Sequence, residues 1–443
     1  MLISFSVRNF KSVKDKITLS FEADNSKDLE DYYVIEPIPG LRLLKLGLIY
    51  GPNGSGKTTI LEALSFLRKL IVAPAEKKTD ILDFKPFLFD ENTPTQNSEF
   101  EISFVASGKR FLYAVQFNIE SIASEQLYFY SPNKSLVYQR STDENKQITN
   151  IEFGNKIKIN KAHKSALEAN TLWNNTVLGG FLKTNIESMQ LKEVSDWFYN
   201  KLAPLMRPET SIRRSLTNSL KIGDLKKERM VQLLKKANFK VNDIYVETKP
   251  HVFAENSDNL KKVEVILPLE NTENKAPEDI LKDEASTEIF LSHLVMNGDN
   301  EVSYRLPLSQ ESKGTQRYFE FSGLLDILIN ASIITSIDEM EASLHPDLVK
   351  HFLLLFLVNA KQSQLIVTTH HRELFLDRDI LRDDVIWFTE KKEDGSTDLY
   401  SLNDFDSTVV RDTTSVYNAY KTGKLGAVPE LGDYYLDFTD GEK

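Results

Sequence analysis

Cysteine is absent from this chain of 443 residues, which excludes a disulfide framework and a thiolate metal site. No apolar run approaches the roughly 18 residues of a membrane span, and the first residues alternate like a strand instead of forming a charged and then apolar leader. Positive charge is in deficit, because the formal net charge is −11 and provides no overall attraction to nucleic acid. These absences predict a soluble, cytoplasmic protein with no membrane partner.

A glycine-rich octapeptide, Gly51–Thr58, fits the phosphate-loop pattern G-x-x-x-x-G-K-[ST]. The apolar run Leu46–Tyr50 precedes it as a buried strand would, and Ile60–Leu67 follows with helical spacing. The glycines permit a tight turn whose N–H groups point at an anion, and the next helix adds the positive end of its dipole. The alternative, a glycine-rich turn without phosphate, leaves this order of elements unexplained. The expected nucleotide-binding residues are Gly51, Asn53, Gly54, Ser55, Gly56, Lys57, Thr58 and Thr59.

Two residues of this loop have predicted roles in chemistry. Lys57 can reach the β- and γ-phosphates of ATP, and the Thr58 hydroxyl can ligate Mg²⁺. Two carboxylates end a second apolar strand, Ala331–Glu339. We expect Asp338 to hold Mg²⁺ through water and Glu339 to orient and deprotonate the attacking water. Paired acids at a strand end are also common as plain surface polarity, and for this pair alone that alternative stays open.

The residues after these acids extend the pattern. Met340–Pro346 resembles the segment that follows the Walker B strand in ABC-type ATPases, and Gln364–Thr369 is another buried strand that ends at His370. The resemblance implies that His370 is the switch histidine that senses the γ-phosphate. An ordinary loop histidine is the alternative, and a register shift of one would give the role to His371.

A third motif, Glu311–Gln316, precedes an expected helix at Tyr318–Leu328. It resembles the ABC signature, in which residues at a helix N-terminus bind the γ-phosphate held by the opposite subunit. Ser312, Gly314 and Thr315 would do so here, although Lys313 stands where glycine is usual. The alternative is a simple helix cap at Ser312.

Together these motifs resemble the prokaryotic ABC-like ATPases related to the SMC, RecF and OLD heads. More closely, the chain resembles the AAA-15-type ATPases of phage-defence operons, the abortive-infection AbiL and RloA proteins, with the Septu and PARIS ATPases as neighbours. Besides the signature, the segments that carry this resemblance are Met1–Ser12, Pro86–Asp90, Leu233–Ala237, Asp338–Pro346 and Tyr420–Pro429.

This resemblance implies an α/β fold, an ABC-type P-loop ATPase head with an N-terminal antiparallel β subdomain and an inserted, mainly helical lobe. ATP and Mg²⁺ would be enclosed head-to-tail between copies in a homodimer or a higher even homo-oligomer. ATP hydrolysis would then serve a sensor or scaffold that controls a separately encoded nuclease or toxin partner in antiviral defence.

The expected domains are the N-terminal half of the head at 1–154, the lobe at 155–290, the C-terminal half at 291–429 and an acidic, aromatic tail at 430–443. Length and a 41% hydrophobic content permit this division around a sizeable core. Period-two alternation predicts strands within 1–22 and 99–138, and helical patterns occupy 181–203 and 224–237. Further strands are expected at 242–248 and 262–268, and polar linkers at Thr142–Lys146 and Asn271–Glu284.

Several weaker candidates complete the site. Gln96 is the candidate that would contact Mg²⁺ and water from a loop, with plain solvated polarity as its alternative. Asn9, Lys11 and Ser12 would lie near the base or phosphates, with an exposed turn as their alternative.

One segment departs from the acidic character of the chain. Arg207–Lys240 holds ten Lys or Arg and three Asp or Glu. We consider either a surface for nucleic acid or an acidic partner, or a solvated helix face. A RecF-like ATPase that binds DNA directly is therefore the alternative function, and an ATP-bound structural scaffold is a further one. We expect no nuclease site, because neither a downstream Toprim-like domain nor a His-Asn-His cluster is visible.

Overall fold

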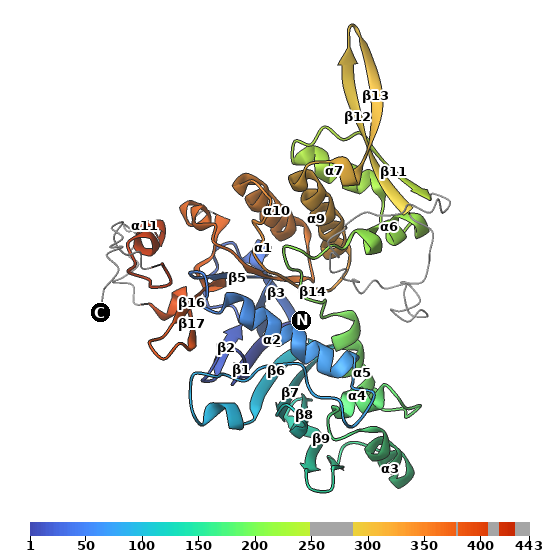
Figure 1. Cartoon of the computed structure of the whole chain (residues 1–443), viewed down its shortest axis with the longest axis vertical. Coiled ribbons are helices and arrows are strands. Elements are labelled where there is room, and N and C mark those ends of the chain that lie inside the picture. The colour runs from blue at the N-terminus through green and yellow to red at the C-terminus, as the bar shows by residue number, and fades with distance from the viewer. Residues whose placement is uncertain (249–286, 378–379, 406–415, 430–443) are drawn as a thin grey trace, which may run out of the picture.

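Two sheets of different kinds organise the residues that the computed structural model describes, namely 1–248, 287–377, 380–405 and 416–429. Figure 1 shows an antiparallel and a mostly parallel sheet on either side of helix α2 (Lys57–Val72). Helices α9 (Lys313–Asn330) and α10 (Pro346–Asn359) lie on the far side of the parallel sheet. The predicted α/β class with an N-terminal antiparallel subdomain is confirmed.

The parallel sheet has the strand order β14, β15, β5, β16, β17, in which only β17 runs antiparallel to its neighbour. Every residue of β5, β14 and β15 is buried, because helices cover both faces of these strands, and this explains their nearly continuous apolar runs. Their carboxyl ends meet at one edge, where ligands bind in open α/β sheets. The strands are β5 (Leu46–Tyr50), β14 (Ile334–Ile337), β15 (Gln364–Thr368), β16 (Ile386–Lys391) and β17 (Thr397–Ser401).

The antiparallel sheet has seven strands in the order β10, β9, β8, β7, β6, β1, β2. The expected alternation within 1–22 and 99–138 is confirmed as paired strands. The expected linker Thr142–Lys146 instead lies within a hairpin, because Thr142 and Asp143 end β9 and residues 144–147 turn into β10. The strands are β1 (Leu2–Arg8), β2 (Ile17–Ser20), β6 (Ser98–Ala106), β7 (Lys109–Phe117), β8 (Ile122–Tyr130), β9 (Lys134–Asp143) and β10 (Ile148–Phe153).

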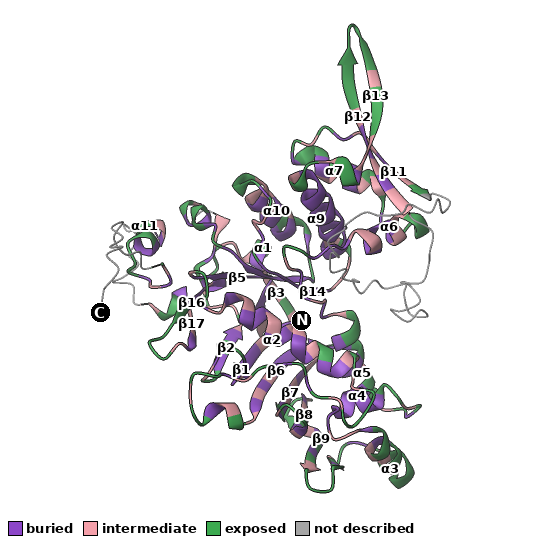
Figure 2. Ribbon diagram, viewed as in Figure 1, coloured by how far each residue is buried: buried purple, intermediate pink, exposed green. Residues whose placement is uncertain are grey.

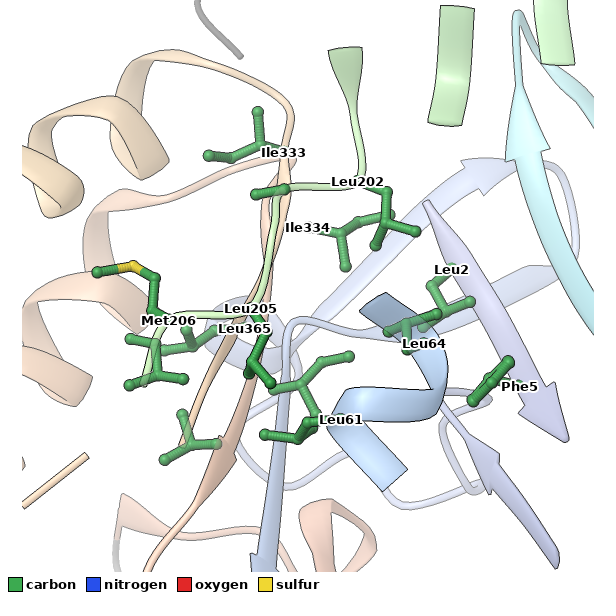
Figure 3. Close-up of a cluster of buried hydrophobic side chains, with 14 of the residues drawn as sticks. Leu2, Phe5, Leu61, Leu64, Leu202, Leu205, Met206, Ile333, Ile334 and Leu365 are labelled. Carbon is green, nitrogen blue, oxygen red and sulfur yellow. The ribbon is translucent and has the colours of Figure 1, made fainter. Parts of the chain in front are cut away.

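One continuous hydrophobic core joins the two sheets through α2. Figure 3 shows Leu61 and Leu64 of α2 among side chains of β1, β14 and β15. A buried amide adds polar contacts at this junction. The Gln364 side chain accepts a hydrogen bond from Leu2 N at 2.6 Å and donates to the carbonyls of Leu2 and Leu44 at 2.9 and 3.0 Å. This amide satisfies backbone groups that would otherwise be buried without partners.

The segment expected as one inserted lobe, 155–290, divides between two places. Helices α3 (Lys161–Asn170), α4 (Val177–Phe181) and α5 (Met189–Asn200) pack on β10, α2 and β6, whereas α6 (Arg213–Ile222) and α7 (Lys227–Lys236) pack on α9. Between them, Leu202 and Met206 form parallel bridges to Ile334 and Ile337 and so extend the parallel sheet past β14. The helical pattern at 224–237 is confirmed as α7, but 181–203 is not one helix, because residues 182–188 separate α4 from α5.

A third sheet, in the order β11, β12, β13, flanks α7 and includes a long hairpin. Figure 2 shows the outer part of this hairpin largely exposed, while α9 is mostly buried. Strand β11 confirms the strand predicted at 242–248, and it pairs with β12. The predicted strand 262–268, the predicted linker 271–284 and the predicted tail 430–443 lie outside the described residues. The strands are β11 (Asp243–Thr248), β12 (Thr287–Asn297) and β13 (Asn300–Pro307).

Short elements complete the fold, and Lys45 connects two of its layers. The Lys45 ammonium donates to the carbonyls of Leu357 and Ala360 at the end of α10, where orphan carbonyls favour a cation.

Among the described residues, none of the helices has the length and apolar character needed to cross a bilayer. The remaining elements are α1 (Glu30–Tyr33), β3 (Val34–Ile38), β4 (Leu41–Leu44), η1 (Thr93–Thr95), η2 (Leu308–Gln310), η3 (Arg372–Leu376), η5 (Asp383–Val385), η6 (Leu402–Asp404) and α11 (Val416–Lys421).

Candidate nucleotide-binding site

The phosphate loop spans residues 51–56 between β5 and α2, as the sequence predicts. Gly56 caps α2 with φ 107°, a left-handed conformation that glycine adopts at little cost, and a Cβ there would collide with Thr397. The Ser55 hydroxyl lies 2.6 Å from the Thr389 hydroxyl, and Thr397 donates to the Ser55 carbonyl at 2.9 Å. Strands β16 and β17 therefore support the loop from behind, while Asn53 and Gly54 are exposed.

Lys57 begins α2, and its buried ammonium donates to the carbonyls of Gly51 and Pro52 at 2.8 and 3.0 Å. Burial lowers the pKa of Lys57, and the negative charges of Asp338, Glu339 and Glu341 oppose that shift. The lysine therefore lies in the loop that would cradle phosphates, with the carboxylates of the second motif close enough to act on it.

The Thr58 hydroxyl donates to both carboxylate oxygens of Asp338, at 3.1 and 2.9 Å. These two residues are 280 positions apart in sequence, and β5 and β14 bring them together at the same edge of the sheet. Hard oxygen donors in this arrangement fit Mg²⁺, which usually takes only one or two protein ligands together with phosphate and water. Among the described residues, no group of three or more His, Asp or Glu side chains could hold a metal alone.

The end of β15 fixes both acids of the pair. The Thr368 hydroxyl donates to Asp338 Oδ1 at 2.5 Å and accepts a hydrogen bond from Glu339 N at 2.8 Å. Asp338 is buried, whereas Glu339 is exposed and has φ 45°, in the left-handed region that non-glycine residues rarely adopt. Strained backbone of this kind persists where surrounding contacts enforce it, and it clusters at functional sites.

The two neighbouring histidines have different surroundings. His370 is exposed, and the loss of part of its hydration and then the charge of Lys57 lower its pKa, against the charges of Glu341, Glu339 and Asp338. His371 is 8% exposed, and neither of its ring nitrogens has a hydrogen-bond partner in the described chain. His370 is therefore the exposed histidine of the pair and the one on which the charge of Lys57 acts, and its γ-phosphate role stays a prediction.

The signature segment begins α9, which starts at Lys313, five residues before the expected helix. Ser312 caps this helix by accepting from Thr315 N at 3.1 Å, and the two hydroxyls lie 2.8 Å apart. The carbonyl of Ser343 lies 3.2 Å from the place that a Cβ of Gly314 would occupy. Ser312 therefore has the cap geometry of the simpler alternative, and within the described residues no hydrogen bond joins Ser312, Gly314 or Thr315 to the phosphate loop of the same chain.

The structure separates the four weaker candidates. The Ser12 hydroxyl donates to Thr59 Oγ1 at 3.0 Å, so Ser12 lies beside the phosphate-loop helix. Asn9 is fully buried and its side chain bonds the backbone of the 87–96 loop, which overturns the exposed-turn alternative at this position. Lys11 pairs with Glu62 at 2.6 Å. Gln96 accepts from Arg8 at 2.9 Å and has no described bond to Thr58 or Asp338, so its metal role stays a prediction.

Sequence reasoning missed the residues that hold the site from outside its motifs. Thr368 could have been suspected, because a hydroxyl residue near the end of a buried strand needs a partner. Thr389 and Thr397 had no local signal, since they reach the loop only through the strand order of the folded sheet.

The basic segment Arg207–Lys240 is partly neutralised in the folded chain. Arg207 pairs with Glu62 at 2.6 Å, Lys227 with Asp243 at 2.9 Å and Arg229 with Asp326 at 2.9 Å. Three acids from outside the segment therefore offset part of the positive excess that the sequence shows.

A family model described as "AAA domain, putative AbiEii toxin, Type IV TA system" matches residues 48–377, which are 330 of the 443 residues. The chain belongs to this family. The match to this AAA_21 family begins in β5, ends just after η3 and contains Lys57, Asp338, Glu339 and His370. No curated protein matches the chain.

Solved structures with a similar arrangement include heads of SMC proteins. The SMC head domain from Thermotoga maritima has a TM-score of 0.41 at 13% identity, covering 90% of this chain and 98% of that chain. A Pyrococcus furiosus Smc head with an extended coiled coil, bound to the C-terminal domain of ScpA, has a TM-score of 0.41 at 13% identity and covers 96% and 98%.

Proposed function

We propose that this AAA_21 protein binds ATP·Mg²⁺ at its phosphate loop and hydrolyses it between two copies of the chain. The observation that carries the proposal is the contact of Thr58 with Asp338, beside an exposed Glu339 whose side chain has no partner among the described residues. Groups that could bind phosphate, hold a metal and act as a general base would then work together at one sheet edge.

Each residue has a defined task in this mechanism. Backbone N–H groups of the loop and the Lys57 ammonium bind the phosphates, and Lys57 exchanges its bonds to Gly51 and Pro52 for bonds to phosphate. Thr58 and Asp338 would hold Mg²⁺, which supplies charge neutralisation at the β- and γ-phosphates when bound. Glu339 accepts the proton of the attacking water, and His370 donates a hydrogen bond to the γ-phosphate.

The signature residues would complete the site of a second copy. Ser312, Gly314 and Thr315 lie at the N-terminus of the 18-residue helix α9, whose dipole favours an anion. Among the described residues these three form no hydrogen bond with their own phosphate loop, which is consistent with a contact to the nucleotide of a second copy. Closure on ATP and reopening after hydrolysis would give two states that a partner can distinguish.

We further propose that this cycle controls a separately encoded toxin or nuclease in antiviral defence, as in the AbiL, RloA, Septu and PARIS systems that the sequence resembles. The family description, which names a toxin and a type IV toxin–antitoxin system, supports this setting. A tagged copy recovered from its own host is expected to carry such a polypeptide in stoichiometric amount. Recovery of the chain alone, with turnover stimulated by DNA, would contradict this role.

Two substitutions test the ATPase itself. Glu339→Gln is expected to bind ATP normally but to lose about 100- to 10,000-fold in turnover, the usual contribution of a general base. Its ATP-bound form is expected to sediment as a dimer or a higher even oligomer. Lys57→Ala is expected to lose tight ATP binding and to remain in the nucleotide-free assembly state. A Glu339→Gln protein that saturates with ATP as a monomer would rule out the two-copy site.

The RecF-like alternative depends on the basic segment, and its ion pairs weaken that case. Charge reversal at Lys226, Lys235 and Lys236, which are exposed and have no ion pair among the described residues, separates the functions. Direct DNA binding predicts that the variant loses salt-sensitive binding, whereas the toxin-control proposal predicts unchanged ATP turnover and partner recovery.

A further inference from the structure

A third carboxylate lies in the turn that carries Asp338 and Glu339. Glu341 follows Glu339 by two positions, and among the described residues no Lys, Arg or His side chain forms an ion pair with it. Three acids in four residues repel one another, and an additional acid without a cation is costly unless it makes compensating hydrogen bonds. The metal-binding and water-activating roles are assigned to the first two acids, so Glu341 needs another explanation.

The contacts of Glu341 lead to the switch-histidine loop. One carboxylate oxygen, Oε1, accepts a hydrogen bond from the backbone N–H of His370 at 2.6 Å. The other oxygen, Oε2, is buried and has no hydrogen-bond partner in the described chain. The Glu341 side chain therefore makes one described hydrogen bond, to a backbone donor two residues beyond the last residue of β15.

This bond belongs to a set that joins the two loops. Glu339 N donates to the Thr368 hydroxyl at 2.8 Å, and Met340 N donates to the Thr368 carbonyl at 3.2 Å. The bond from His370 N to Glu341 runs in the opposite direction, from the β15 loop to the β14 turn. Without it, the backbone of His370 would be held by neighbours in its own loop alone, and a single exposed peptide is easily displaced.

We propose that Glu341 is a positioning residue, whose carboxylate fixes the His370 backbone against the turn that carries Glu339. The base and the histidine are then presented to the nucleotide from one rigid unit. The proposal rests on the proposed ATPase function, and it assigns Glu341 no contact with the substrate. A small misplacement of a catalytic group is enough to lower turnover while the substrate still binds.

The experiment compares ATP turnover in Glu341→Ala, Glu341→Gln and a control, Glu373→Gln. Glu373 is an exposed acid of the same loop that lies near His371 and Arg372, so its substitution removes a charge without touching the His370 backbone. Glu341→Ala is expected to lower kcat about 10- to 100-fold, as loss of an outer positioning partner does at other sites, with KM changed little. Glu341→Gln retains an acceptor for His370 N and is expected to restore most of kcat.

A double-mutant cycle with His370→Ala separates positioning from a general structural role. If Glu341 acts through His370, then Glu341→Ala is expected to have little further effect on kcat once the imidazole is gone. Additive losses, or a Glu341→Gln variant as slow as Glu341→Ala, would overturn the proposal. Failure of the function itself is recognised separately, because the unmodified protein would then show no turnover that depends on Lys57.

Discussion

Two polar clusters of this chain contain ionisable groups with displaced pKa values, yet they differ in every other respect. One is the nucleotide-site turn, where the pKa of His370 is lowered. The other lies inside the antiparallel sheet, where Glu125 of β8 is opposite Arg140 of β9. Burial raises the pKa of Glu125 and lowers the pKa of Arg140 to about 10, and each charge opposes the shift of its neighbour.

The acids of the two clusters differ in their hydrogen bonding and in their backbone conformation. Both oxygens of the fully buried Glu125 are used, since Tyr113 and Tyr138 donate to one at 3.0 and 2.5 Å and Val177 N donates to the other at 2.8 Å. Glu339, by contrast, is exposed, stands on left-handed backbone and has no described side-chain partner. A displaced pKa therefore occurs both in a structural cluster and in the proposed catalytic one, and an exposed acid on left-handed backbone distinguishes the latter.

The largest expected effect breaks the structural cluster. Arg140→Met leaves the Glu125 charge uncompensated in the sheet interior, and we expect the free energy of unfolding to fall by about 3 kcal/mol. Urea denaturation measures this loss, and turnover per folded molecule is expected to stay unchanged. Arg110→Met is the control, because Arg110 lies 5.0 Å from the Tyr130 ring on the neighbouring strands and is only half-buried. Its loss is expected to cost about 1 kcal/mol or less, and equal losses in the two variants would contradict the comparison.

The same contrast explains what sequence could predict. The motifs at Gly51–Thr58 and Asp338–Glu339 are local, because each is a strand end followed by residues whose chemistry depends on their order. The alternating strands of the N-terminal half were equally readable. The split of 155–290 was not, because only the long-range bridge of Met206 to Ile337 shows where that chain returns. The supports Thr368, Thr397 and Glu341 were also missed, since their partners are set by strand order and not by spacing.

A smaller effect is expected where the reactive cluster depends on a structural group. Thr368→Val keeps the shape of a fully buried side chain but removes the donor to Asp338 and the acceptor for Glu339 N. We expect a loss of about 1–3 kcal/mol in stability, together with slower turnover, because the strained turn is less well held. Thr335→Val is a matched control in the same sheet, since the Thr335 hydroxyl is buried without a described partner. Equal effects of the two substitutions would show that Thr368 does not hold the turn.

The smallest expected effect is a pair of opposite pH dependences. The pKa of His370 is lowered from its ordinary value of 6.5, so below pH 6.5 the unfolded chain binds more protons at this position and stability falls as pH falls. The pKa of Glu125 is raised from 4.5, so the folded chain binds more protons above that pH and stability falls as pH rises. Urea unfolding between pH 5 and 8 is therefore expected to give a stability difference from His370→Gln that shrinks on acidification, and one from Glu125→Gln that grows. The His370 slope is expected to be the weaker, because its imidazole is exposed and water screens its charge. If the two stability differences changed with pH in the same direction, the proposed contrast between the two clusters would be wrong.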